Sequence, residues 1–201
     1  MSRRWISKRK HDPYHKQAKL QGYRARSAFK LKQMDNKFRF LKPGIKVLDI
    51  GAAPGSWLQI VSERIGDTGT VIGVDIDEIK PLGLPNIKTI QGNILDEETQ
   101  KKIRNLVGKR LDVVIADIAP NVSGNWDIDQ YNQLELARMS MIIAKKLLFR
   151  KGWFITKVFQ GIDYDEFLRD VKASFKRVKV FKPSASRKSS AEIYLIAHGL
   201  K

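Results

Sequence analysis

From Ile45 onward, short apolar runs alternate with amphipathic stretches, and few folds accommodate that order. The stretches at 56–66 and 96–108 carry apolar residues at helical spacing, so we expect helices there. The runs predicted to be strands are 45–50, 70–76, 87–92, 111–118 and 153–159. Because these runs are too apolar to alternate with polar residues, they predict strands buried on both faces. The chain should therefore form a parallel sheet between two layers of helices.

The last part of the chain follows a different pattern. Two strand-like segments, 175–183 and 191–199, flank a polar loop with no helical stretch between them. Strands joined by a loop pair antiparallel. We therefore predict an α/β chain with the Rossmann-like class I methyltransferase fold, whose mostly parallel sheet ends in an antiparallel C-terminal hairpin. A third helical stretch, 131–152, ends in basic residues and Gly152, which is typical of a helix C-terminus.

Charged residues are unevenly distributed along the chain. Lys and Arg total 38 against 21 for Asp and Glu, an excess that favours a polyanionic partner. Residues 1–42 hold 14 basic and 2 acidic side chains, whereas residues 43–144 hold 10 and 14. Aromatic residues are interleaved with the N-terminal charges, which suits phosphate contacts combined with base stacking. We therefore expect residues 1–42 to be a basic RNA-binding arm with a helix at 27–38, and residues 43–201 to be the catalytic domain. A solubilising tail is the alternative.

Composition excludes several classes of site. The chain has no Cys, so it holds no disulfide, thiolate zinc site, iron–sulfur cluster or Cys nucleophile. Its three His residues are not clustered, and we expect no metal. No apolar run approaches the ~20 residues that span a bilayer, and the basic N-terminus lacks the apolar stretch of a signal peptide. We expect a cytoplasmic monomer.

The strongest local motif is VLDIGAAPGSW at 47–57. A buried strand runs into Gly51 and Gly55 and then into a helix. Glycine lets the backbone approach a ligand closely, and the crevice at the strand ends of an open parallel sheet is where cofactors bind. The glycine spacing is not GxGxxG, so a dinucleotide pyrophosphate fits poorly. Taken alone, the motif could also be an ordinary strand–helix turn.

The next two strands strengthen this interpretation. Asp75 ends the second strand, where a carboxylate can accept hydrogen bonds from ribose hydroxyls. Asn93 follows the third strand, where an amide can meet an adenine edge. Glycine loop, acid and amide on three successive strand ends predict an adenosine site. S-adenosylmethionine suits this loop better than NAD.

Two charged residues belong to strands that are otherwise apolar. Asp117 lies at the end of the fourth strand, and Lys157 lies inside the fifth. A helix N-cap for Asp117 and a snorkelling side chain for Lys157 are the structural alternatives. A lysine beside an acid on a neighbouring central strand is better explained by a functional site.

From about residue 14 onward, the chain resembles the FtsJ/RrmJ-type ribose 2′-O-methyltransferases. The matching segments are GYRARSAFKL, LDIGAAPGSW, ADIAPNVSG, ITKVFQG and KPSASRKSSAEIYLIA. The resemblance implies a catalytic tetrad of Lys30, Asp117, Lys157 and Glu192. It implies cofactor contacts at Gly55, Trp57, Asp75, Asn93 and Asp117, beside the Gly51 of the glycine turn. The sequence departs from the family at Ser56, where Gly is usual, and at Asn93, where Asp is usual. Asn keeps an acceptor carbonyl, so we expect cofactor binding to survive.

The implied reaction is attack of a ribose 2′-oxygen on the sulfonium methyl of S-adenosylmethionine. Lys157 is the candidate base and must be neutral to act; Asp117 could instead steer Lys157 and the cofactor, while Lys30 and Glu192 orient the ribose. We expect a uridine of large-subunit ribosomal RNA as the target, with the tRNA anticodon loop as the alternative. A non-catalytic RNA-binding module and a nicotinamide-dependent dehydrogenase are the rival classes.

Overall fold

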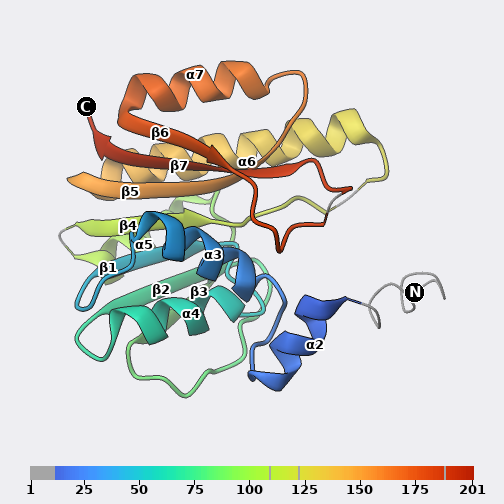
Figure 1. Cartoon of the computed structure of the whole chain (residues 1–201). Helices are drawn as coiled ribbons and strands as arrows, with labels where there is room; N and C mark the ends of the chain where they lie inside the picture. Colours follow the sequence, from blue (N-terminus) through green and yellow to red (C-terminus); the bar gives the residue numbers. More distant parts are fainter. Residues whose placement is uncertain (1–11, 109, 122, 188) are drawn as a thin grey trace.

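The protein is built on one sheet of seven strands in the order β3-β2-β1-β4-β5-β7-β6 (Figure 1). The computed structural model describes residues 12–108, 110–121, 123–187 and 189–201. The strands are β1 (Lys46–Ile50), β2 (Thr70–Asp75), β3 (Ile87–Gln91), β4 (Leu111–Ala116), β5 (Leu148–Phe159), β6 (Phe175–Phe181) and β7 (Glu192–Leu200). All seven predicted strands are present.

The strand directions confirm the mostly parallel sheet with an antiparallel C-terminal hairpin. Strands β1 to β5 pair in parallel, whereas β7 pairs antiparallel with β5 on one side and with β6 on the other. It follows that β6 runs in the same direction as the first five strands. The last strand is therefore inserted between two strands that precede it in the chain.

Helices cover both faces of the sheet, as predicted. They are α2 (Pro13–Leu20), α3 (Ala28–Phe38), α4 (Ser56–Ile65), α5 (Glu97–Val107), α6 (Trp126–Leu147) and α7 (Tyr164–Ser174). Along β4, Val113 and Ile115 pack with α3 and α4, while Val114 and Ala116 pack with α5, α6 and α7. Figure 1 shows α3 and α4 in front of the sheet and α6 behind it. We call the side under α3 and α4 the front face.

One predicted boundary is wrong. Helix α6 does not end at Gly152 but at Leu147, and β5 begins at once, so that Gly152 lies inside a strand. The pairing of β4 with β5 is irregular here, since Leu111 pairs with Leu148 while Val113 pairs with Trp153. A Cβ on Gly152 would lie 2.9–3.1 Å from the Leu148 side chain and two backbone carbonyls. The glycine permits a crowded strand rather than ending a helix.

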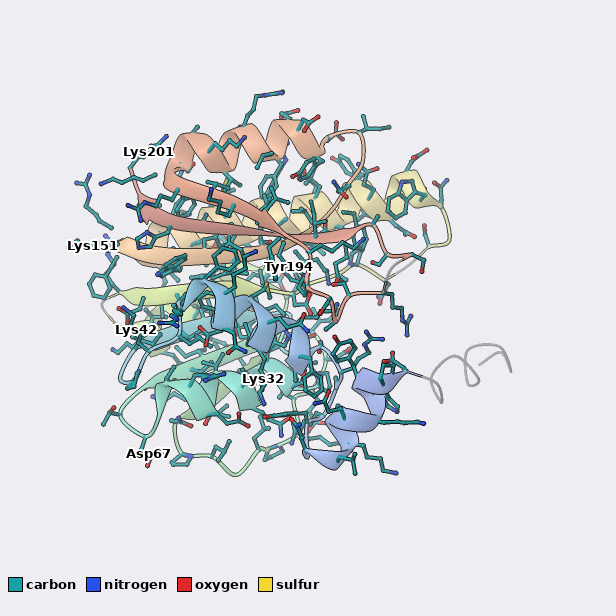
Figure 2. All side chains as sticks on the ribbon, in the orientation of Figure 1. Lys32, Lys42, Asp67, Lys151, Tyr194 and Lys201 are labelled. Carbon is teal, nitrogen blue, oxygen red and sulfur yellow. The ribbon has the colours of Figure 1, made fainter. Side chains whose placement is uncertain are left out.

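The N-terminal basic segment contributes directly to the core. Helix α3 buries Ala28, Leu31 and Met34 in the same apolar cluster as Tyr194 of β7. Figure 2 shows Tyr194 near the middle of the molecule and lysines such as Lys42 towards its edge. The division at residue 42 stays a prediction, and residues 1–11 of the predicted arm lie outside the described residues. Within the part described, no helix combines the length and apolarity needed to cross a bilayer.

Candidate active site

A cavity of about 360 Å³ opens at the carboxyl ends of the central strands. It lies where the strand order reverses, with β2 on one side of β1 and β4 on the other, and such a switch point is where open α/β sheets bind ligands. Its lining includes Gly51, Asp75, Asn93 and Asp117. The structure thus brings together four residues that the sequence predicted for one cofactor site.

The glycine turn is shaped by close contacts. Gly51 has φ +79°, and a Cβ there would lie 2.6 Å from the Cα of Ile118. The carboxylate of Asp75 holds the same loop from the other side, because its Oδ2 accepts a hydrogen bond from the Ala53 amide at 2.8 Å. Its Oδ1 accepts from the Asp77 amide at 3.0 Å. Asp75 therefore orders the glycine turn as well as facing the cavity.

Gly55 and Trp57 do not line this cavity. Trp57 is 3% exposed, and its indole N–H donates to the Ser27 carbonyl at 2.8 Å. Its ring lies 6.0 Å from that of Tyr194. Ser56, which replaces the usual glycine, forms a hydroxyl–hydroxyl hydrogen bond of 2.8 Å with Ser27. These contacts fasten α4 to the start of α3, and the predicted cofactor contacts of Gly55 and Trp57 stay predictions.

Sequence reasoning missed Asp49, which lies in the middle of β1. Its side chain is fully buried, and among the described residues neither carboxylate oxygen has a hydrogen-bond partner. Burial, together with the nearby carboxylates of Asp117 and Asp75, raises the pKa of Asp49 well above its usual value. The signal that could have found it is the one that found Lys157, a charged residue within an apolar strand. The raised pKa favours the protonated, neutral form of this carboxyl.

The Lys157 ammonium lies against Asp117. Its Nζ is 3.1 Å from Oδ1 of Asp117 and donates to the Asp117 backbone carbonyl at 2.7 Å. Lys157 is only 6% exposed. The hydroxyl of Tyr194 donates to the same Oδ1 at 2.8 Å. Burial raises the pKa of Asp117, but the ammonium groups of Lys157 and Lys30 and the Tyr194 hydroxyl outweigh it, so its pKa lies below the usual value.

The second ion pair of the predicted tetrad lies beside the first. Lys30 Nζ donates to both carboxylate oxygens of Glu192, at 2.6 and 2.8 Å. The hydroxyl of Ser186 donates to Glu192 Oε1 at 2.8 Å, and Glu192 is buried. Charge-assisted bonds of this kind fix both side chains.

The fold explains how distant residues meet. Lys157 pairs with Tyr194 across β5 and β7, and Glu192 lies two residues before Tyr194 on β7, so these three side chains project from the front face. Helix α3, which covers that face, supplies Lys30. The structure therefore brings the four predicted tetrad residues together and adds Tyr194, an unpredicted neighbour. Burial and the carboxylates of Asp117 and Glu192 raise the pKa of Tyr194 well above its usual value, so its hydroxyl keeps its proton.

A smaller hollow of about 190 Å³ adjoins the Lys30–Glu192 pair. Arg26 and Arg187 line it. Burial, with the nearby Arg187, lowers the pKa of Arg26. Arg26 is also paired with Asp12 and donates to the Ala185 carbonyl. The hollow therefore places positive charge directly beside the second ion pair. Among the described residues, no cluster of His, Asp or Glu could hold a metal ion.

A seven-stranded sheet of this order, with a ligand cavity at the β1–β4 switch point, defines the class I methyltransferase fold. The FtsJ-like methyltransferase pattern matches residues 23–200. The chain is 46% identical to "Ribosomal RNA large subunit methyltransferase E" of Methanocaldococcus jannaschii, covering 97% of this chain and 81% of that protein. It is 49% identical to the protein of the same name in Methanothrix thermoacetophila, covering 94% and 72%.

A solved structure agrees with these sequence comparisons. A Plasmodium falciparum protein described as a ribosomal RNA methyltransferase superposes with a TM-score of 0.78 at 31% identity, covering 89% of this chain and 98% of that one. The chain belongs to the FtsJ-like methyltransferase family.

Proposed function

We propose that the protein transfers a methyl group from S-adenosylmethionine to a ribose 2′-hydroxyl of large-subunit ribosomal RNA, at a uridine. The observation that carries the proposal is the buried Lys157–Asp117 pair, which sits at the edge of the cofactor cavity and beside the Lys30–Glu192 pair. A base at the mouth of a nucleoside cavity, next to a basic hollow, suits a hydroxyl nucleophile carried by a polyanion.

The residues present fit the cofactor. Asp75 and Asp117 line the cavity, where their carboxylates suit a sulfonium and an ammonium group. Asp75 uses one lone pair of each oxygen on the backbone, so its remaining lone pairs can accept ribose hydroxyls, and Asn93 can meet the adenine edge. A dinucleotide pyrophosphate would be repelled here, which disfavours a dehydrogenase. When bound, S-adenosylmethionine supplies an electrophilic methyl group.

Each residue of the tetrad has a separate role in the reaction of the ribose hydroxyl. A ribose hydroxyl is a weak nucleophile, so a group must take its proton as the 2′-oxygen attacks the methyl carbon. Lys157, in its neutral form, accepts that proton, and Asp117 orients Lys157 and stabilises the ammonium that forms. Lys30 stabilises negative charge developing on the 2′-oxygen, and Glu192 holds Lys30 in place. The intact tetrad also disfavours a non-catalytic RNA-binding module.

Two observations support the choice of RNA, and the proposed target, a ribose 2′-hydroxyl, is absent from DNA. Arg26 and Arg187 lie beside Lys30, where a phosphate next to the target nucleotide would be held. The relatives at 46% and 49% identity are named for large-subunit ribosomal RNA, which favours that RNA over the tRNA anticodon loop. We place the protein, as a monomer, in the cytoplasm with its proposed substrate.

The test is methyl transfer from radiolabelled S-adenosylmethionine to ribosomal RNA isolated from a strain that lacks the gene. We expect one labelled nucleotide, whose 2′-O-methyl group blocks alkaline cleavage at that position. DNA of the same sequence and total tRNA serve as competing substrates. Labelling of tRNA in place of ribosomal RNA would reassign the substrate, and the absence of transfer to any RNA would overturn the proposal.

A further inference from the structure

The front face of the sheet is incompletely covered at its β6 end. Register places Trp153, His198 and Arg177 side by side in one row across β5, β7 and β6. Lys179 lies in the next row, opposite Ile196. Arg177 and Lys179 are exposed, while Trp153 and His198 are half-buried. This row does not take part in the mechanism above.

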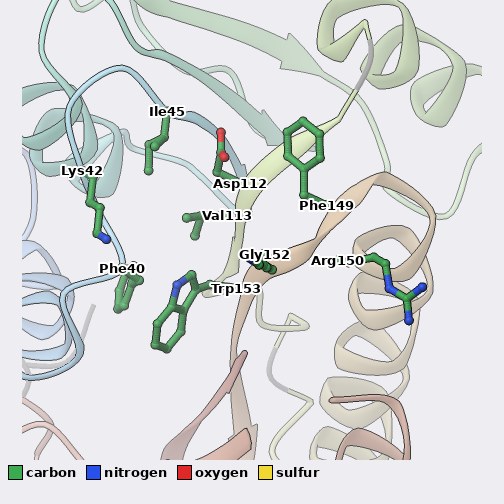
Figure 3. A pocket seen from close by; sticks show the side chains of 10 residues that line it. Phe40, Lys42, Ile45, Asp112, Val113, Phe149, Arg150, Gly152 and Trp153 are labelled. Carbon is green, nitrogen blue, oxygen red and sulfur yellow. The ribbon is translucent and has the colours of Figure 1, made fainter. Parts of the chain in front are cut away.

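Aromatic rings form the floor of this area. The rings of Trp153 and His198 lie 4.2 Å apart, and the Trp153 ring lies 6.1 Å from that of Phe40. An open groove of about 540 Å³ borders them. Figure 3 shows Phe40, Trp153 and Lys42 on one side of this groove and Phe149 across from them. Phe149 is 49% exposed, so a large flat side chain here faces solvent.

The charges around the rings are predominantly positive. Lys42, Arg150 and Lys151 line the groove, and Arg177 and Lys179 are exposed on β6, which β7 separates from β5. Arg177 is the cross-strand partner of His198, and burial together with Arg177 and Lys42 lowers the pKa of that imidazole. Among the described lining residues the one acid is Asp112, and its carboxylate accepts the Lys46 amide at 2.8 Å. Cations beside exposed rings suit a single-stranded nucleic acid.

We propose that this surface, made of Lys42, Phe149, Trp153, Arg177 and Lys179, binds a second segment of the substrate RNA. Cations contact its phosphates, and a base stacks on an aromatic ring. Trp153 precedes Lys157 by four residues on β5, which separates the surface from the tetrad by about 13 Å. The RNA therefore contacts the protein at two places, one for chemistry and one for affinity. The inference rests on the proposed function only in taking RNA as the ligand.

Arg177→Gln with Lys179→Gln removes two cations from exposed positions on β6. Arg169→Gln with Lys172→Gln is the matched control, because both are exposed on α7 behind the sheet and the charge change is equal. The probe is a labelled 20-nucleotide oligouridylate, titrated at several salt concentrations. We expect weaker binding by the β6 variant and a salt slope reduced by about 0.7 per lost phosphate contact. The control should bind like the wild type, and Phe149→Ala should weaken binding by at least about fivefold.

Steady-state methylation of large-subunit ribosomal RNA separates this inference from the proposed function. The β6 variant should raise KM for RNA and leave kcat unchanged, because the tetrad is untouched. A variant that matches its control in both RNA affinity and salt slope would overturn the second contact, even if methyl transfer proceeds normally. Loss of binding to poly-L-glutamate with unchanged RNA binding would assign the surface to an acidic protein instead. The oligouridylate titration tests the second RNA contact even if no RNA is methylated.

A separate observation concerns Gln133, which is fully buried on α6. Strand β4 ends at Ala116, opposite Thr156, so the next part of β5 has no β4 neighbour. The Gln133 amide takes that place. Its Nε2 donates to the Lys157 carbonyl at 2.6 Å, and its Oε1 accepts from the Phe159 amide at 3.0 Å.

We infer that Gln133 is a positioning residue for Lys157. Its two hydrogen bonds replace those that a neighbouring strand would make with β5. They therefore fix the backbone at Lys157, whose side chain contacts Asp117. A small displacement of a positioned base costs rate without affecting binding. This inference rests on the proposed role of Lys157 in proton transfer.

The variant is Gln133→Met, which keeps the length of the side chain and removes both hydrogen bonds. We expect a single-turnover rate roughly 10- to 100-fold lower, with unchanged RNA and cofactor affinity. In a Lys157→Ala background the same change should cost no further rate, whereas additive losses would overturn the inference. If Gln133→Met fails to fold, Gln133→Glu, which keeps the acceptor for the Phe159 amide, is compared in the same cycle. Failure of Lys157→Ala to lower the rate would instead count against the proposed function.

Discussion

The hydroxyl of Tyr194 and the ammonium of Lys157 share one oxygen, Oδ1 of Asp117, at 2.8 and 3.1 Å. These two donors help to keep the Asp117 carboxylate ionised. Because Tyr194 lies on β7 and Lys157 on β5, both strands orient this carboxylate. Lys157, the proposed base, is thus linked to the last strand of the sheet through the carboxylate of Asp117.

Tyr194→Phe removes one of these donors and leaves the ring in the core. Because a buried hydrogen bond to a charged group contributes about 1.5–3 kcal/mol, we expect a comparable loss in the free energy of unfolding. The pKa of Asp117 should rise, since the hydroxyl is among the groups that lower it. Denaturant unfolding measures the first effect. Tyr164→Phe on α7 is the control, and equal stability of the two variants would show that the bond contributes little.

Lys157→Ala should fold and bind cofactor yet lose roughly 10²–10⁴-fold in the chemical step, the usual contribution of a positioned base. Lys157→Arg should fail nearly as badly, because a guanidinium stays protonated. Single-turnover rates at saturating RNA and cofactor give the measurement. An arginine variant with near-native rates would refute proton transfer by this residue and leave it a purely electrostatic role.

Asp75→Ala should weaken S-adenosylmethionine binding by about 2–4 kcal/mol if both ribose hydroxyls pair with the carboxylate. The loss includes the bond that orders the loop at Ala53. Calorimetry with S-adenosylmethionine gives the affinity, and NAD, which we expect not to bind, is the comparison ligand. Glu78→Ala is a matched control, because this exposed acid follows β2 but does not line the cavity. Unchanged affinity in the Asp75 variant would contradict its assignment.

Asp49→Asn tests the buried carboxyl through pH. Burial raises the pKa of Asp49 well above the value near 3.8 that it has when unfolded, so the folded protein binds the proton more tightly. Stability therefore falls as pH rises above about 4 and through the folded pKa. Asp49→Asn should remove that loss and raise Tm at pH 7 by at least about 2 °C, while matching the wild type below pH 4.

Thermal unfolding of the cofactor-free protein across this pH range provides the measurement. Asp67→Asn, at an exposed carboxylate, should leave the curve unchanged. A pH profile of Asp49→Asn that parallels the wild type would show that the carboxyl is already solvated or paired.

Most of the strands and part of the candidate site could be predicted from local sequence patterns. Apolar runs located β1, β2 and β4, because burial on both faces leaves a strong signal in sequence. The predicted burial on both faces is wrong for the run at 87–92, because β3 lies at the edge of the sheet and is mostly exposed. The glycine turn, Asp75 and Asn93 could be placed in one crevice because the strand ends of a parallel sheet share an edge. Lys30 and Glu192 came only from resemblance, since they are 162 residues apart and nothing local indicates that they meet.

The remaining features depend on tertiary packing. Tyr194 looks like a core aromatic until register places it opposite Lys157. Gln133 looks like a polar residue on an amphipathic helix, and only the end of β4 explains its burial. The α6–β5 boundary was missed because basic residues followed by Gly152 also suit a helix end. In each case the deciding contact is distant in sequence.

The insertion of β7 between β5 and β6 has a consequence for biogenesis. Until β7 is synthesised, β5 lacks its neighbour on one side and β6 lacks its only partner in the sheet. The same strand carries Glu192 and Tyr194, so a nascent chain that has not reached it has neither a finished core nor a complete tetrad. Such pairings between distant segments form late in folding. Completion of the sheet and assembly of the proposed tetrad therefore both wait for β7.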